Sequence, residues 1–462
     1  MLAVAEPEHN RNEKKEIIMD YKGLTEQLVK KCLDKGADAA EVFIESGRNQ
    51  SIEVRNGKIE TVQEASSHGV GFRVFVEGRM AFSNCNDFSD ILLENAISSA
   101  VQFARNTTPD ENNVLPDDKG ITEVEGLYDP EISNISMETK IEMAKEVEEL
   151  AMEDSRITKS SGSRFSEGEE EIFLANSNGL LKNYKSAACS YGVGVVAEKG
   201  DQKSTGYEYC SRRFFSDLKS PEEIAAEAAK KAYEMLDSQL VKTQKAAVIF
   251  DPDVARSILR GILGAINGER VLQGASFLAD KMDQQIATEL MTVIDDGIRP
   301  KGMNSKPFDG EGVPTRKRTI VEKGVLKGFM YNTIVAKRAG VKSTGNASRG
   351  GFRRLPGIGS HNLFMAAGKN TPEEIIQATK TGLLLKGVTG SGINSVNGNF
   401  SGGASGFWIE NGKIAFPVKG LTIAGTAEKM LNGIDMVGND LDLNLSFTAP
   451  TFRIKLLQIG GK

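Results

Sequence analysis

The chain has 462 residues, enough for two or three domains with sizeable hydrophobic cores, which excludes a small protein that depends on disulfides. Its 57 Lys and Arg residues against 63 Asp and Glu residues give a formal net charge of −6, so it has no overall positive field that would attract nucleic acid. We therefore expect no direct nucleic-acid partner.

The N-terminal residues lack the features of a secretory signal or a membrane anchor. The sequence turns charged by Glu6, and Ala246–Phe250 is among the longest clean apolar runs, far shorter than a membrane-spanning helix. We expect a soluble, cytoplasmic protein with no membrane partner, in which residues 1–18 are a flexible extension. The four cysteines have no Cys-x-x-Cys spacing, which favours free thiols: Cys32, Cys85, Cys189 and Cys210.

Residues 19–240 are predicted to form an N-terminal domain in which helices frame strands. Helical spacing of apolar residues precedes Gly36, and Asn56-Gly57 is a type I′ turn signal that joins two strands in a hairpin. Asp87 or Ser89 caps a following helix. The segments that read as strands are 41–46, 51–56, 59–63 and 71–76.

The same order of elements recurs later in this half of the chain. Ser136 opens a second amphipathic helix, Asn178-Gly179 is a second hairpin turn, and residues 192–196 repeat the glycine-bearing strand pattern of residues 69–74. A helix capped by Ser220, with Pro221 in its first turn, closes the repeat near Met235. We infer an internal duplication of an α-β-β-β-β-α unit.

A polar hinge at residues 242–245 follows the last helix of this half, and we place the domain boundary near residue 240, with a β-rich domain over 241–462. That domain opens with the strand Ala246–Phe250 and the helix Val254–Ile266, and Thr371 caps a short helix further on. Short strands and glycine turns fill the rest. The pattern predicts an α+β fold, with helices and a mixed or antiparallel sheet first and a β-rich domain with inserted helices second.

The densest glycine segment, residues 387–406, allows two interpretations. It lacks the Lys-Ser or Lys-Thr of a phosphate-binding loop, but its exposed backbone suits the binding of an extended peptide by strand addition. The alternative, which we favour on sequence alone, is a set of tight turns in a curved sheet. The candidate peptide-binding residues are Asn397, Gly398, Asn399, Phe400, Ser401, Gly402 and Gly403.

Other charged clusters favour structural roles. Carboxylates at 295–296, 309–311 and 440–442 lack the layout of a calcium loop, and acidic loop residues are usually solvated or capping. Basic clusters at 316–318 and 349–354 allow either a solvated loop or capture of a carboxylate.

Histidine is scarce, which limits metal chemistry. The only histidines are His9, His68 and His361, so no His-Glu-x-x-x-His helix exists, and no cysteine follows Cys210. A zinc site built from the C-terminal half is therefore not expected, and His361 is expected to be a packed or hydrogen-bonded residue.

Several segments of the second half resemble one family. They are Lys306-Pro307-Phe308-Asp309-Gly310-Glu311-Gly312-Val313, Ser343-Thr344-Gly345-Asn346-Ala347, residues 397–404 and Ile409-Glu410-Asn411-Gly412-Lys413. This collection resembles the TldD/PmbA family, once called modulators of DNA gyrase, and within it the PmbA or TldE branch. The resemblance spans nearly the whole chain and is strongest over 246–462. It implies an N-terminal α/β layer domain and a C-terminal domain of large antiparallel sheets.

The resemblance also implies a cytosolic protease assembly of two homologous subunits that acts on unfolded or short peptides. In the TldD branch, a helix early in the C-terminal domain carries His-Glu-x-x-x-His and a later cysteine completes a zinc site. That motif falls on residues 259–264 here, where the degenerate positions are Leu259, Arg260 and Gly264. The late cysteine would fall within 435–439, which contains none.

These observations predict a metal-free, non-catalytic subunit that binds peptides and works with a zinc-bearing TldD-type homologue. Zinc is expected in the partner and no cofactor in this chain. The sequence leaves open whether the chain has any enzymatic part of its own. The alternative from another class is a self-standing, homodimeric peptide- or protein-binding scaffold without a protease role.

Overall fold

The structure of the chain is a computed structural model that describes residues 20–390 and 392–462. The predicted extension over residues 1–18 lies outside the described residues. The first half forms one six-stranded sheet in the order β3-β2-β1-β4-β5-β6, all antiparallel. Its elements are α1 (Tyr21–Asp34), β1 (Ala39–Arg55), β2 (Lys58–Val76), β3 (Arg79–Cys85), α2 (Asp90–Ala104), α3 (Met137–Met152), β4 (Ile157–Asn176), β5 (Leu180–Lys199), β6 (Gln202–Arg212) and α4 (Pro221–Tyr233).

The two predicted hairpin turns join the longest strands of this sheet. Asn56-Gly57 connects β1 to β2 and has positive φ at both residues, and β4 and β5 meet at the Asn178-Gly179 turn. The prediction of four strands per repeat was wrong. The segments 41–46 and 51–56 are one strand, β1, and the segments 59–63 and 71–76 are one strand, β2. Each half of the sheet therefore has the order α-β-β-β-α.

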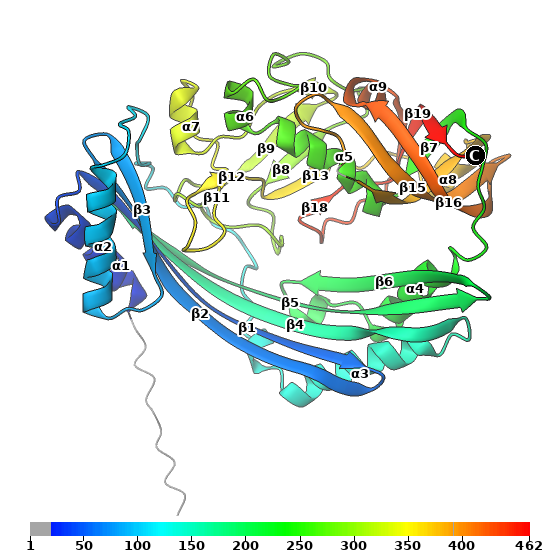
Figure 1. Ribbon diagram of the computed structural model, residues 1–462, viewed down its shortest axis with the longest axis horizontal. Helices are drawn as coiled ribbons and strands as arrows, with labels where there is room; N and C mark the ends of the chain where they lie inside the picture. The colour runs from blue at the N-terminus through cyan, green and yellow to red at the C-terminus, as the bar shows by residue number, and fades with distance from the viewer. Residues whose placement is uncertain (1–19, 391) are drawn as a thin grey trace, which may run out of the picture.

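The two faces of this sheet pack against different parts of the molecule. Even-numbered residues of β1, such as Val42 and Ile52, lie in the cores formed with the four helices. Odd-numbered residues face the C-terminal half, where Phe43 packs with Phe308 and Phe352. Figure 1 shows α3 on the outer face of the long curved strands and the C-terminal half above their concave face.

The C-terminal half contains two larger sheets and a two-stranded one. A six-stranded sheet has the order β16-β15-β14-β7-β19-β17, and a five-stranded sheet has the order β10-β9-β8-β13-β18. Pairing is antiparallel except for β7 with β14 and β13 with β18. The strands are β7 (Gln244–Phe250), β8 (Val293–Asp296), β9 (Lys317–Glu322), β10 (Val325–Leu326), β11 (Ala347–Ser348), β12 (Gly357–Ile358), β13 (Asn362–Met365), β14 (Thr381–Thr389), β15 (Asn399–Glu410), β16 (Lys413–Thr426), β17 (Ile434–Val437), β18 (Phe447–Thr448) and β19 (Phe452–Gly460).

Helices of this half are short except for the first. They are α5 (Pro252–Ala265), α6 (Gly268–Leu272), α7 (Thr333–Arg338), α8 (Pro372–Gln377) and α9 (Ala427–Asn432). The helix α8 begins at the predicted cap, because the Thr371 hydroxyl accepts from the Glu374 N–H and the Glu374 carboxylate accepts from the Thr371 N–H. The mixture of helices and extensive antiparallel sheets confirms the predicted α+β class. Within the described ranges, no helix is both long and apolar enough to cross a membrane.

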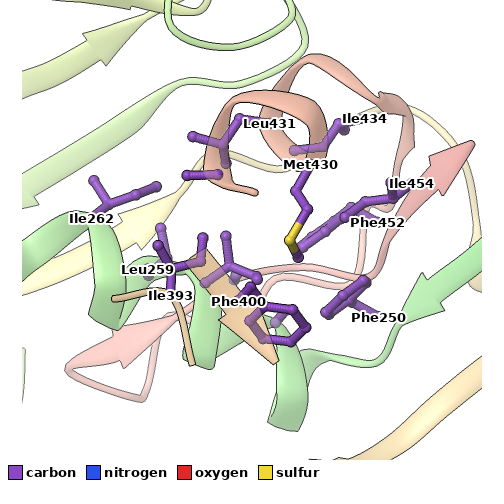
Figure 2. Packing of buried hydrophobic residues seen from close by; sticks show 14 of the residues in the cluster. Phe250, Leu259, Ile262, Ile393, Phe400, Met430, Leu431, Ile434, Phe452 and Ile454 are labelled. Atoms are coloured by element: carbon purple, nitrogen blue, oxygen red, sulfur yellow. The ribbon is translucent and has the colours of Figure 1, made fainter. Parts of the chain in front are cut away.

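The helix α5 lies against the core of the C-terminal half with one face. Asp251 caps the helix. The apolar side chains of α5 recur at helical spacing on one face, so Ile258, Leu259 and Ile262 are buried. Figure 2 shows Leu259 and Ile262 in the cluster that also holds Phe400 and Met430. The opposite face of α5 is left free to line a cleft.

Candidate functional site

A cleft of about 550 Å³ opens beside the free face of α5. Its walls come from α5, from the start of α6 and from residues 393–396, which precede β15. The lining residues are Arg260, Gly261, Leu263, Gly264, Asn267, Arg270, Met330, Ile358, Ile393, Asn394, Ser395 and Val396. The volume lies within the range of small-molecule and cofactor sites. Two of the three degenerate zinc-helix positions, Arg260 and Gly264, therefore line one cleft, while Leu259 is buried in the core.

Two glycines of α5 let residues 393–396 approach the helix closely. A β-carbon at Gly261 would lie 2.4 Å from Cβ of Ile393, and one at Gly264 would lie 2.8 Å from Cβ of Ser395. Both distances are shorter than any van der Waals contact between carbon atoms. The shape of the cleft thus depends on the absence of side chains at these two positions.

The charged groups of the cleft are two guanidinium groups. Arg270 donates a 2.6 Å hydrogen bond from Nη1 to Oγ of Ser395, and the same Nη1 would lie 3.6 Å from a β-carbon at Gly264. Arg260 is exposed and, within residues 20–390 and 392–462, makes no ion pair or side-chain hydrogen bond. No carboxylate lines the cleft, so its charge is positive.

The donors on this face of α5 do not fit zinc. Structural and catalytic zinc sites use thiolate, imidazole or carboxylate ligands, whereas this helix presents a buried leucine, an arginine and a glycine. The Arg270 guanidinium beside Gly264 would repel a cation. Among the residues that the structure describes, no three His, Cys, Asp or Glu side chains are grouped so that they could hold a metal ion. Asp435, in the segment where the resemblance places a cysteine, instead forms a two-bond ion pair with Arg453.

The candidate peptide-binding segment lies next to the cleft. Its first two residues, Asn397 and Gly398, line a second cavity of about 310 Å³ together with Phe277 and Leu278. The backbone of residues 399–404 pairs with β16 on one side. On the other side, Phe400 bridges Ile393 and residues 403–404 pair with β14. Strand addition at residues 399–403 would have to displace these partners, so the glycine-rich segment is built into the sheet.

One family-like motif, residues 306–313, reaches a buried ion network between the two halves of the chain through Glu311. Arg73 of β2 donates from Nη2 to Glu41 Oε2 at 2.6 Å and from Nη1 to Glu311 Oε1 at 2.8 Å. Arg349 donates to the other oxygen of Glu41. All four side chains are at most 3% exposed. Burial opposes the charge of Arg73, but Glu41 and Glu311 keep its pKa above the usual range.

A second carboxylate from the same motif lies beside Glu311. Asp309 accepts backbone hydrogen bonds from Glu311, Val313 and Ala347. Burial, followed by the negative charge of Glu311, raises the pKa of Asp309 to about 6. The bond from the Ala347 N–H connects the family-like motifs at residues 306–313 and 343–347.

His361 is a buried hydrogen-bonding residue. Its backbone N–H donates to Asp295 Oδ1 at 2.7 Å, and its ring Nδ1 lies 3.2 Å from Asp295 Oδ2. Asn346 donates to the same carboxylate oxygen at 2.8 Å. The acidic residue Asp440 binds Thr451 through both of its oxygens. The acidic residues noted in the sequence therefore have hydrogen-bond partners within the fold.

Sequence reasoning did not find Arg270, Ser395 or the ion network. Arg270 and Ser395 are 125 positions apart, and neither lies in a motif with a known spacing. The two glycines of α5 are the one signal in the sequence, because glycine inside an amphipathic helix often marks a close contact.

Three family models of the PmbA/TldA metallopeptidases match the chain: domain 1 over residues 40–106, the central domain over 130–236 and the C-terminal domain over 243–461. A relative named metalloprotease PmbA, from Escherichia coli O157:H7, is 31% identical over 92% of this chain and 93% of its own length. A metalloprotease TldD homologue from Buchnera aphidicola is 24% identical over 94% of each chain.

Solved structures match over similar lengths. A protein from Bacteroides thetaiotaomicron, named as a modulator of DNA gyrase, has 30% identity and a TM-score of 0.88, and covers 96% of this chain and 100% of its own. TldE from Thermococcus kodakarensis has 26% identity and a TM-score of 0.86, over 94% and 99% of the two chains. The expected resemblance is confirmed, and the chain belongs to the PmbA/TldD metallopeptidase family.

Proposed function

We propose that this chain is a metal-free, non-catalytic subunit of a two-subunit metallopeptidase, in which a TldD-type homologue carries the zinc. The observation that carries the proposal is the face of α5 at the cleft. There two positions of the zinc-binding motif hold Arg260 and Gly264, with the Arg270 guanidinium beside Gly264, while the third position holds Leu259, which is buried in the core. A chain of this family with a positive group in place of zinc ligands needs another source for the Lewis acid that activates water.

The substrates that we propose are unfolded or short peptides. Two features support this class. The cleft beside α5 combines apolar walls with polar groups. The neighbouring cavity is lined by Asn397 and Gly398 together with the apolar side chains of Phe277 and Leu278. Peptide contact is proposed at Asn397 and Gly398 and at the turn before β15, rather than by addition of a strand to β15.

Purification with and without a TldD-type partner tests the proposal. The isolated chain should contain no stoichiometric zinc and should not cleave an unfolded peptide. The complex should bind zinc and cleave the peptide, and a chelator should stop cleavage. Chelator-sensitive cleavage by the isolated chain would overturn the proposal. Failure to form a complex, together with specific peptide binding by a homodimer, would instead indicate a self-standing scaffold.

A further inference from the structure

Four side chains that line the cleft beside α5 have hydrogen-bond donors without a partner among the described residues: Arg260, Asn267, Arg270 and Asn394. Asn267 uses its Oδ1 to accept from the N–H groups of Glu269 and Arg270, and Asn394 uses its Oδ1 to accept from those of Val396 and Asn397. In the described part of the chain, neither side-chain NH₂ group has a hydrogen-bond partner. With the guanidinium groups of Arg260 and Arg270, the lining therefore calls for a ligand rich in acceptors.

The two arginines differ in how firmly they are held. Ser395 accepts from one nitrogen of Arg270 and so fixes its direction, which leaves the rest of its planar fork free. Arg260 lies one turn before Gly264 on the same face of α5, and nothing in the described residues neutralises it. By contrast, Arg256, one turn earlier, already pairs with Asp253 at 2.5 Å and does not line the cleft. Two guanidinium groups that line one cleft without a carboxylate match an anionic ligand.

The apolar walls narrow the class of anion. The apolar surface open to a ligand comes from the half-buried Leu263 and Ile358 and the exposed Val396, backed by the buried Ile393 and Met330. A phosphate or an inorganic anion would leave these apolar surfaces without a partner. The last residue of a peptide has a carboxylate, a carbonyl acceptor from the preceding residue and a side chain within a few ångströms of each other, which matches donors set among apolar groups.

We propose that this cleft binds the terminal carboxylate of a peptide whose last residue is apolar, with Arg260 and Arg270 holding the carboxylate and Asn267 and Asn394 donating to its neighbouring carbonyl groups. This proposal rests on the proposed function for its ligand class, since it assumes that peptides are what the chain binds. In this proposal, the face of α5 that carries zinc ligands in the TldD branch binds one end of the peptide.

Binding of N-terminally labelled peptides to the full chain, alone and with a TldD-type partner, tests this assignment by fluorescence anisotropy. The probes are Ala-Ala-Ala-Leu-Phe as the free acid, the same peptide with an amidated C-terminus, and the amidated peptide Ala-Glu-Ala-Leu-Phe. The free acid should bind about tenfold or more tightly than its amide, because charged hydrogen bonds are lost in the amide. Equal affinity of the two would overturn the proposal, and so would recovery of full affinity by the amidated Glu peptide, which would indicate an acidic side chain as the ligand.

Three variants assign the effect to the cleft. Arg260→Gln and Arg270→Gln should each weaken binding of the free acid about tenfold and leave binding of the amide unchanged. Arg256→Gln, on the same helix but outside the cleft, is the control and should bind like the wild type. Unchanged binding in both cleft variants would overturn the proposal while leaving peptide binding intact. Absence of binding of every peptide to the wild type, alone and in the complex, would overturn the proposed function as well. Circular dichroism checks that each variant is folded.

Discussion

Arg73 of β2 and Glu311, which precedes β9, are 238 positions apart in the chain and are joined by a 2.8 Å hydrogen bond between fully buried side chains. The bond crosses from the N-terminal sheet to the C-terminal half. Glu311 also accepts from the N–H of Thr333 at 2.7 Å, at the start of α7. One carboxylate thus connects the sheet, the family-like motif and a helix.

Replacing this carboxylate should be costly. Glu311→Gln leaves Arg73 and Arg349 with a single carboxylate, Glu41, in a buried environment, and we expect it to lower the free energy of unfolding by about 3–5 kcal/mol. Urea unfolding measures the loss. Glu64→Gln is the matched control, because Glu64 pairs with Arg48 at 2.9 Å between exposed side chains, and such a pair contributes about 0–1 kcal/mol. Equal losses in the two variants would contradict this account.

The stability of the chain should depend on pH through Asp309. Its pKa is about 6 in the folded chain and ordinary when unfolded, so between about pH 4 and 6 the folded state binds more protons than the unfolded state. The contribution of this group is therefore fully favourable below about pH 4 and is lost as the pH rises to about 6. We expect the loss to be on the order of 3 kcal/mol.

Comparison with Asp309→Asn isolates this contribution. The asparagine amide cannot titrate. Its NH₂ group would face one of the backbone N–H donors, so one hydrogen bond is lost, and the variant should be less stable by an amount that does not depend on pH. Urea unfolding between pH 4 and 7 should show a steeper fall for the wild type than for the variant. Parallel curves would refute the raised pKa as a source of pH dependence.

The sequence predicted the local structure of the chain well where a local interaction decides it. The Asn56-Gly57 turn needs positive φ at two residues, and the Thr371 cap needs a hydroxyl and a carboxylate three residues apart, so both can be read from a few neighbouring residues. The strand β1 was predicted as two pieces because residues 47–50 are polar or glycine. In the fold, β2 and β4 pair with this stretch from both sides and keep it extended.

The site could be predicted only in part, because some of its contacts join residues that are far apart in the sequence. The helix that becomes α5 and the positions Arg260 and Gly264 follow from the pattern and the resemblance. The contact of Arg270 with Ser395 does not, because it depends on how the turn before β15 lies against α5. Residues 399–403 of the glycine-rich segment lie in the strand β15, and their pairing with β16 and β14 is a long-range property that neighbouring residues do not reveal.

The glycine at position 261 should be required for the packing of α5. Gly261→Ala adds a carbon 2.4 Å from Cβ of Ile393 and 2.8 Å from its carbonyl oxygen. Alanine favours a helix by about 1 kcal/mol, but the overlap costs about 1–3 kcal/mol, so we expect net destabilisation on the order of 1 kcal/mol. Thermal unfolding measures it. Gly23→Ala in α1 is the control, because the added carbon there meets only the exposed carboxylate of the capping residue Asp20, and the helix preference of alanine should about offset a weakened cap, so the variant should be near neutral. A stabilised Gly261→Ala would show that residues 393–396 move away easily.

The proposed peptide contact at the turn before β15 predicts a difference between two neighbouring asparagines. Asn397 and Asn399 are both exposed, but only Asn397 lines the cavity that holds Phe277. If peptides bind in that cavity, Asn397→Ala should weaken binding of an unfolded peptide several-fold, because a net hydrogen bond is worth about 1 kcal/mol, while Asn399→Ala should not. Fluorescence anisotropy with the full chain measures both. Equal weakening by both variants would favour contact along the strand β15, and no weakening by either would remove this segment from the peptide site.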